Sequence, residues 1–214
     1  MQSKVFLEGE GNRYFSRCQI REKCEDGTNP AAQDLASKLM EMYQLEPASV
    51  LDIGCSNGFR LEGLRTSLGA EGYGLEPGID AINDGRSRFP HLNLKQGVCS
   101  NIPWERTFDL VIINFVLHWV ERESVGQCID EIDRVLDSGG LLILGDFFPD
   151  TSTENEYHHL PDRIRTFKEH YFEHFTKRGY THLAHLSSHH DRIKTLEVCS
   201  DPAQRVVVSL LQKR

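Results

Sequence analysis

The chain has 214 residues, with 24 Lys or Arg and 32 Asp or Glu, which gives a formal net charge of −8. This length predicts one domain, or one domain with a modest extension. The hydrophobic share of 39% and the charged share of 26% argue against disorder. The acidic balance disfavours a broad nucleic-acid-binding surface, because such surfaces are usually basic.

No stretch of the sequence predicts a membrane span. The most apolar segment, residues 110–120, is interrupted by Asn114 and His118 and is far shorter than the roughly 20 residues that a spanning helix needs. The first residues lack the apolar region of a secretory signal, and the six cysteines include no Cys-x-x-Cys pair. We therefore expect free thiols and a cytoplasmic location.

Short apolar runs alternate with helical patterns from residue 49 onward, after a polar segment and an expected helix at 31–43. This alternation predicts parallel strands joined by crossover helices, and apolar strands indicate a sheet covered on both faces. The last two strands have no clear helix between them, so we expect them to pair antiparallel. The expected strands are 50–53, 73–76, 92–94, 108–113, 141–147, 181–186 and 205–211, and the later helices are 59–68, 79–88, 124–136 and 162–178.

The sharpest feature is the turn at residues 52–58, Asp-Ile-Gly-Cys-Ser-Asn-Gly, between an expected strand and an expected helix. Ligands of open α/β sheets bind beyond the carboxyl ends of the strands. Gly54 and Gly58 let the backbone approach a ligand closely. Asp52 can accept hydrogen bonds from an ammonium group, and Glu76, which closes the next strand, suits the two donating hydroxyls of a ribose.

Two other interpretations of this turn compete. A dinucleotide site requires Gly-x-Gly-x-x-Gly, whereas the turn reads Gly-x-Ser-x-Gly, which disfavours NAD and FAD. The turn matches the nucleophile elbow of serine hydrolases, with Ser56 followed by Asp146 and His189 in the hydrolase order. However, the segment before the turn shows no strands and no His-Gly-Gly motif to supply the second oxyanion donor. A non-catalytic binding module that keeps the fold remains a third alternative.

The preferred interpretation is binding of S-adenosylmethionine (SAM), because five ordered segments resemble motifs of class I SAM-dependent methyltransferases. Two of them are similar to the glycine-rich first motif and to the second motif, in which Glu76 takes the ribose-binding position. The others resemble the adenine-lining segment, the fourth strand with its following loop, and the signature after the next helix. The five segments are 50–58, 72–76, 96–103, 108–118 and 136–140.

The sequence departs from the family pattern at two positions. Ser56 replaces the middle glycine of the first motif, and Val98 replaces the acid that usually contacts the adenine amino group. Backbone groups near Cys99 and Ser100 are the expected substitutes for that acid. Affinity for SAM is therefore the property that these departures affect, more than the fold.

The resemblance implies a three-layer, Rossmann-like α/β sandwich with a seven-stranded, mostly parallel sheet. Its strand order would be 3-2-1-4-5-7-6, with strand 7 antiparallel. Residues 1–48 would form an N-terminal arm or lid and a helix, and residues 49–214 the SAM-binding core. The expected cofactor-binding residues are Tyr14, Asp52, Gly54, Cys55, Ser56, Gly58, Glu76, Pro77, Val98, Cys99, Ser100, Asn114 and Phe115.

Catalytic candidates follow the fourth and fifth strands, where an acceptor would face the methyl group. His118 suits base chemistry near neutral pH, but a histidine packed beside Trp119 is an equal alternative. Asp146 would orient a base or cap a loop, and His189 would be a base, a substrate contact or part of a polar surface turn. No metal is expected, because no third ligand accompanies the His170 and His174 pair.

We therefore expect a SAM-dependent methyltransferase that acts on an oxygen or nitrogen atom of a small molecule. The favoured acceptors are a sugar or a secondary metabolite, since the N-terminal segment and the tail are similar to methylases associated with sugar modification of bacterial surface polysaccharides. Neither nucleic acid nor membrane is an expected partner. A protein acceptor stays open, as do the oligomeric state and the general base.

Overall fold

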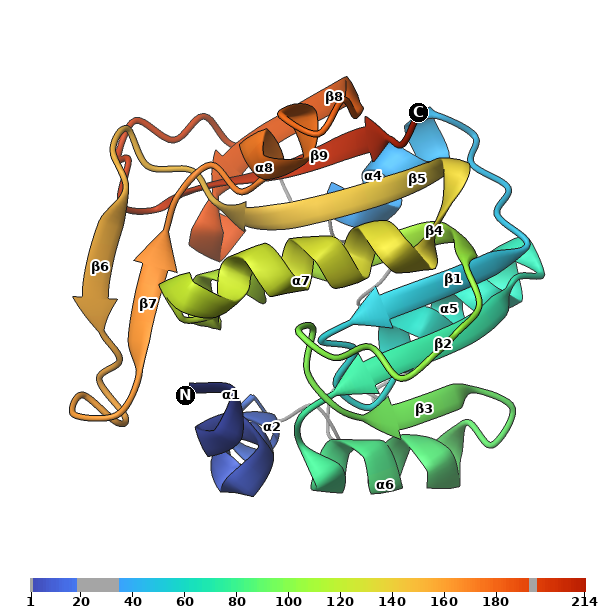
Figure 1. Cartoon of the computed structure of the whole chain (residues 1–214), viewed down its shortest axis with the longest axis horizontal. Coiled ribbons are helices and arrows are strands. Elements are labelled where there is room, and N and C mark those ends of the chain that lie inside the picture. The colour runs from blue at the N-terminus through green and yellow to red at the C-terminus, as the bar shows by residue number, and fades with distance from the viewer. Residues whose placement is uncertain (1, 19–34, 193–195) are drawn as a thin grey trace.

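The computed structural model describes residues 2–18, 35–192 and 196–214. A seven-stranded sheet with helices on both faces forms its centre (Figure 1). The strands are β1 (Ser49–Ile53), β2 (Glu71–Glu76), β3 (Asn93–Gln96), β4 (Phe108–Asn114), β5 (Leu136–Phe147), β8 (Thr181–His189) and β9 (Arg205–Gln212). Their order is β3-β2-β1-β4-β5-β9-β8, and β9 runs antiparallel to β5 and to β8. The predicted fold class and strand order are confirmed.

The apolar runs of the sequence occupy the middle of this sheet. All five residues of β1 are buried, and β4 buries Leu110 through Ile113. These two strands are parallel, with Val50 opposite Leu110 and Ile53 opposite Ile113. Burial on both faces explains why these strands lack the alternation of polar and apolar residues.

Helices cover the two faces of the sheet and make two hydrophobic clusters. On one face, Cys128, Ile129 and Ile132 of a long helix pack with residues of β1 and β4. On the other face, Leu35 and Leu39 pack against residues of β4, β5 and β9. The helices of the first face are α7 (Arg122–Val135) and α8 (Phe172–Thr176), and those of the second are α4 (Leu35–Met42), α5 (Phe59–Leu68) and α6 (Ile79–Arg88). The start of the helix predicted at 31–43 lies outside the described residues.

The helix predicted at 162–178 is wrong over its first part. A separate antiparallel pair of strands, β6 (Thr153–Glu156) and β7 (Arg165–Lys168), occupies this region, and helix is confined to α8. The backbone of Arg165 is also bound by the side chain of Gln2, whose Oε1 accepts from Arg165 N at 2.6 Å. These tertiary partners come from distant segments, so helical periodicity within 162–178 could not reveal them.

The N-terminal residues form three short helical turns, α1 (Gln2–Val5), η1 (Phe6–Glu10) and α2 (Gly11–Arg17). We call these residues, 2–17, the N-terminal arm. The arm lies beside α6 and near the β6–β7 pair (Figure 1). In the described ranges, no helix has the length and hydropathy required to span a membrane.

Candidate cofactor cavity

A cavity of about 420 Å³ opens at the carboxyl ends of β1, β2 and β4. Its walls come from the glycine-rich turn, the end of β2, the segment after β3, the end of β4 and the N-terminal arm. Most of the predicted cofactor-binding residues meet here. Those that line the cavity are Tyr14, Gly54, Cys55, Ser56, Glu76, Pro77, Val98, Cys99, Ser100, Asn114 and Phe115.

The glycine-rich turn is tied to the end of β2 by backbone hydrogen bonds. Gly54 N and Cys55 N both donate to Leu75 O, at 2.8 and 3.2 Å. Gly54 has a φ of 79°, and a Cβ at this position would lie 2.4 Å from Cγ2 of Val116. Only glycine therefore meets both requirements, a left-handed backbone and a close neighbour.

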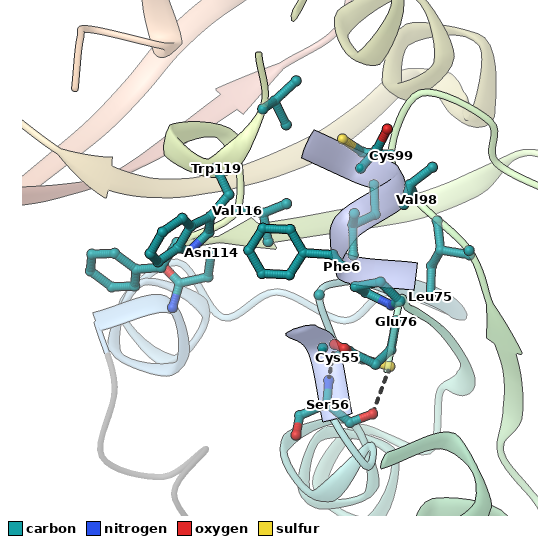
Figure 2. Close-up of a pocket in the computed structure, with 18 of the residues that line it drawn as sticks. Phe6, Cys55, Ser56, Leu75, Glu76, Val98, Cys99, Asn114, Val116 and Trp119 are labelled. Carbon is teal, nitrogen blue, oxygen red and sulfur yellow. Dashed lines mark hydrogen bonds between the residues drawn. The ribbon is translucent and has the colours of Figure 1, made fainter. Parts of the chain in front are cut away.

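Glu76 places a carboxylate in the cavity wall at the end of β2. Its Oε1 accepts from Gly78 N at 2.9 Å. Its Oε2 accepts from Ser56 N at 3.1 Å, as Figure 2 shows. Burial raises the pKa of Glu76 to about 7, although the two N–H donors act in the opposite direction. Each carboxylate oxygen keeps acceptor capacity for a donating ligand, since a carboxylate has about four lone-pair sites.

Two predicted cofactor-binding residues do not line the cavity. The Asp52 carboxylate is fully buried and is paired with Arg60, whose Nη2 donates to Oδ1 at 2.8 Å and whose Nε donates to Oδ2 at 3.2 Å. Gly58 precedes α5 with a φ of 79°, and a Cβ there would meet Leu92. In this structure both residues support the conformation of the glycine-rich turn without lining the cavity.

The segment after β3 forms the opposite wall of the cavity. Val98 and Asn101 make an isolated antiparallel bridge, and Asn101 N donates to Val98 O at 3.0 Å. This tight turn presents Gly97, Val98, Cys99 and Ser100 to the cavity. The segment therefore offers an apolar side chain and backbone groups where the family pattern has an acid.

Asn114 and Phe115 form the wall at the end of β4. Asn114 Oδ1 is one of three buried side-chain atoms without a hydrogen-bond partner in the described part of the chain. It packs against Gly145 of the neighbouring strand, where a Cβ would lie 1.8 Å from it. Phe115 has a φ of 58°, which is uncommon for a bulky residue, and its N–H donates to Gly145 O at 2.8 Å.

The predicted catalytic residues lie outside the cavity wall. His118 belongs to η3 (Leu117–Trp119) and is 3% exposed, and Asp146 is 1% exposed. His118 N donates to Asp146 Oδ2 at 3.1 Å, whereas His118 Nδ1 lies 3.0 Å from Asp146 Oδ1 without the alignment of a hydrogen bond. The histidine packs beside Trp119, with ring centroids 4.6 Å apart.

His189 is also not among the residues that line the cavity. It ends β8, and its Nδ1 accepts from Asp191 N at 3.1 Å. Ser56 is bound through its backbone: its N–H donates to Glu76, and its carbonyl oxygen accepts from the Cys55 thiol. In the described residues, therefore, Ser56, Asp146 and His189 do not form a hydrolase triad. Those residues also contain no group of three or more His, Cys, Asp or Glu that could hold a metal ion.

The N-terminal arm contributes one wall of the cavity. The side chain of Gln2 donates to Trp119 O at 2.7 Å and to Arg165 O at 3.1 Å. Asn12 Oδ1 accepts from Asp80 N at 3.1 Å and thus caps the first turn of α6. Between these two anchors, Phe6 projects into the cavity, as Figure 2 shows.

The sequence did not single out Trp119 for the site and marked Phe6 only as one of several aromatic residues in the arm, although both line the cavity. Their rings are 5.6 Å apart at the centroids, so the two side chains form one aromatic wall. They are 113 residues apart in the sequence. The sequence of the arm is rich in aromatic residues, but this pattern does not indicate that Phe6 packs against Trp119.

The comparisons with known proteins agree with this geometry. Residues 51–144 match the model of a methyltransferase domain family. An N,N-dimethyltransferase of a dTDP-linked amino sugar from Streptomyces venezuelae is 29% identical over 123 residues, which cover 56% of this chain and 51% of that protein. A malonyl-[acyl-carrier protein] O-methyltransferase from Halalkalibacterium halodurans is 24% identical over 150 residues, covering 60% and 52%. The chain spans about half the length of these curated relatives.

Solved structures share the fold across most of the chain. A TehB-like SAM-dependent methyltransferase from Corynebacterium glutamicum superposes with a TM-score of 0.65 at 16% identity, covering 97% of this chain and all of that one. A glycopeptide N-methyltransferase complexed with S-adenosylhomocysteine gives a TM-score of 0.63 at 14% identity, covering 86% and 90%. At these identities the likeness shows the fold.

Proposed function

We propose that this chain, which carries a class I SAM-dependent methyltransferase domain, binds SAM in the cavity and transfers its methyl group to a small molecule. The observation that carries the proposal is Glu76. A partly buried carboxylate that ends the second strand, lines the cavity and retains acceptor capacity suits a ligand with two adjacent hydroxyl donors.

The remaining walls fit the other parts of SAM. The segment with Val98 and Ser100 offers backbone groups and an apolar surface to the adenine. The turn with Gly54 brings bare backbone to the methionine portion, and Asn114 lines the cavity at the end of β4. Asp52 supports this turn through Arg60.

The acceptor would meet the aromatic wall of Phe6 and Trp119. In the described part of the lining, the charged side chains are Arg60, Glu76 and Glu121. Arg60 pairs with Asp52, and Glu121 accepts from Gln2 N at 2.6 Å. A wall of this kind favours an acceptor with an apolar or ring surface and without phosphate groups. A sugar ring or a secondary metabolite without a phosphate tail meets this condition.

When bound, SAM supplies an activated methyl group on a positively charged sulfur atom. The protein has to hold the acceptor atom in line with that methyl group and to exclude water. The arm excludes water in this proposal, because its residues Phe6 and Tyr14 line the cavity. A neutral amine needs no general base, whereas a hydroxyl does. Since His118 and His189 do not line the cavity, we favour nitrogen over oxygen as the acceptor atom.

Calorimetric titration with S-adenosylhomocysteine tests the cofactor site without a known acceptor. We expect the wild type to bind, and Glu76→Ala to bind at least about 30-fold more weakly, because two hydrogen bonds to a charged group contribute about 2 kcal/mol or more. Glu71→Ala is the matched control, since Glu71 is exposed at the other end of β2. Absence of wild-type binding, or equal binding by both variants, would refute the proposed site.

A further inference from the structure

Two cysteines from different elements meet in the wall of the cavity. Cys99 lies in the segment after β3, and Cys128 lies in the middle of α7. Their sulfur atoms are 2.7 Å apart. Cys99 is 5% exposed, Cys128 is fully buried, and both line the cavity.

The distance between the two sulfur atoms is longer than a disulfide bond and shorter than an ordinary non-bonded contact. The sulfur atoms of a disulfide are about 2.0 Å apart, while even carbon atoms, which are smaller than sulfur, prefer a non-bonded separation of about 3.5–4.0 Å. The two side chains are therefore already directed at each other. Little movement separates this arrangement from a covalent bond.

Neighbouring hydrogen bonds hold the two segments in this register. One turn beyond Cys128, Glu131 Oε2 accepts from Ile102 N at 2.7 Å. Another turn on, Arg134 donates to Ile102 O at 2.9 Å and to Trp104 O at 2.8 Å. Cys128, Glu131 and Arg134 are spaced by three residues and share one face of α7. The approach of the sulfur atoms is thus part of a continuous docking of the segment on the helix.

We propose that Cys99 and Cys128 form a disulfide when the protein meets a peroxide, which makes the wall of the cavity an oxidative modification site. The peroxide first oxidises the Cys99 sulfur to a sulfenic acid and leaves as water. The Cys128 sulfur then attacks the Cys99 sulfur, the S–S bond forms, and the sulfenic hydroxyl leaves with the Cys128 proton as a second water. Two thiols and one hydrogen peroxide thus give one disulfide and two waters.

The order of attack follows from the environment of each thiol. Cys99 faces the cavity through which a small oxidant can enter. The contact with Cys99, together with burial, raises the pKa of the Cys128 thiol well above its usual range. Because the thiolate is the reactive form, Cys128 reacts second and slowly. We expect the disulfide to accumulate over minutes to hours.

The test is oxidation of the reduced full-length chain with hydrogen peroxide, followed by intact and peptide mass spectrometry. We expect a loss in mass of two hydrogen atoms and a cross-linked peptide pair that contains Cys99 and Cys128. The melting temperature should also rise by roughly 5 °C or more, because the cross-link closes a loop of about 30 residues. No cofactor is added, so the result does not depend on SAM binding.

Three variants make the assignment specific. Cys99→Ser and Cys128→Ala should each abolish the cross-link, and the first covers the case in which the buried Cys128→Ala variant fails to fold. Cys55→Ser is the matched control, because Cys55 is also buried and lines the cavity. It should retain the cross-link. A wild type that forms no Cys99–Cys128 peptide, or a Cys99→Ser variant that loses the same mass, would overturn the proposal.

Discussion

Glu76 and Asp146 are two carboxylates at the carboxyl edge of the same sheet, and they face different surroundings, since Glu76 is partly exposed and Asp146 is buried. Glu76, at the end of β2, opens into the cavity and is held by the N–H groups of Ser56 and Gly78. Asp146, near the end of β5, is turned toward His118 and accepts from the N–H groups of His118 and Phe147. Position at a strand end thus does not decide whether a carboxylate can meet a ligand. The conformation of the loop that follows the strand decides whether the carboxylate can meet a ligand.

The largest effect that we expect from this comparison is on stability. Asp146→Ala should lower the free energy of unfolding by about 2–4 kcal/mol, because it leaves the buried N–H of His118, the partly buried N–H of Phe147 and the His118 side chain without this partner. Urea denaturation measures this effect. The exposed Asp130→Ala on α7 is the control and should change stability little.

Asp146→Ala also tests whether Asp146 and Glu76 differ in their roles. If Asp146 only supports the wall, the folded fraction of Asp146→Ala should bind S-adenosylhomocysteine within about threefold of the wild type. Unchanged stability with lost binding would instead place Asp146 among the cofactor-binding residues. The distinction between the two carboxylates would then be false.

A smaller effect is expected from pH. The pKa of Glu76 is raised to about 7 by burial, so the carboxylate gains its charge as pH rises through that value. Ribose hydroxyls donate more strongly to the charged form, and affinity for S-adenosylhomocysteine should therefore increase up to about tenfold between pH 6 and pH 8. Titrations across this range in wild type and Glu76→Gln check it. A profile that is equally steep in the variant would assign the effect to another group.

The pKa of Glu76 also fixes the sign of its effect on stability. The folded protein binds more protons at Glu76 than the unfolded chain does between pH 4.5 and about 7. This residue therefore makes the protein less stable as pH rises through that window. Glu76→Gln should remove this part of the pH dependence, which denaturation at pH 5 and pH 7 can measure.

The smallest effect is expected from the arm, which lines the same cavity as Glu76. Gln2→Ala removes the hydrogen bonds to Trp119 and Arg165, worth about 1 kcal/mol net. Dissociation of S-adenosylhomocysteine should become about fivefold faster, which stopped-flow tryptophan fluorescence can follow. Lys4→Ala, on the exposed side of the arm, should have no effect. An unchanged rate in Gln2→Ala would show that the arm does not control release.

Much of the fold and one half of the site could be predicted from the sequence. The alternation of apolar strands and helices indicated the sheet, and the resemblance gave its order. Glu76 and the glycine-rich turn are only about 20 residues apart, and both follow short strands, so local patterns were sufficient to bring them together.

The remainder depends on contacts between distant segments. The β6–β7 pair is held in part by Gln2, which is 163 residues away from Arg165. The direction of His118 depends on Asp146 and on the rings of Trp119 and Phe147. No periodicity or spacing within one segment specifies such partners. Residue type could therefore suggest a base at His118, but not the direction of its side chain.

The contact between Gly11 and Gly78 has a consequence for how this sequence can change. A Cβ on Gly11 would lie 2.7 Å from Gly78 N, and a Cβ on Gly78 would lie 2.9 Å from the carbonyl carbon of Gly11. The backbones of the two residues are in direct contact, and glycine is already the smallest residue. No substitution at one position can therefore make room for a side chain at the other. We expect the two glycines to be retained together in descendants that keep the arm.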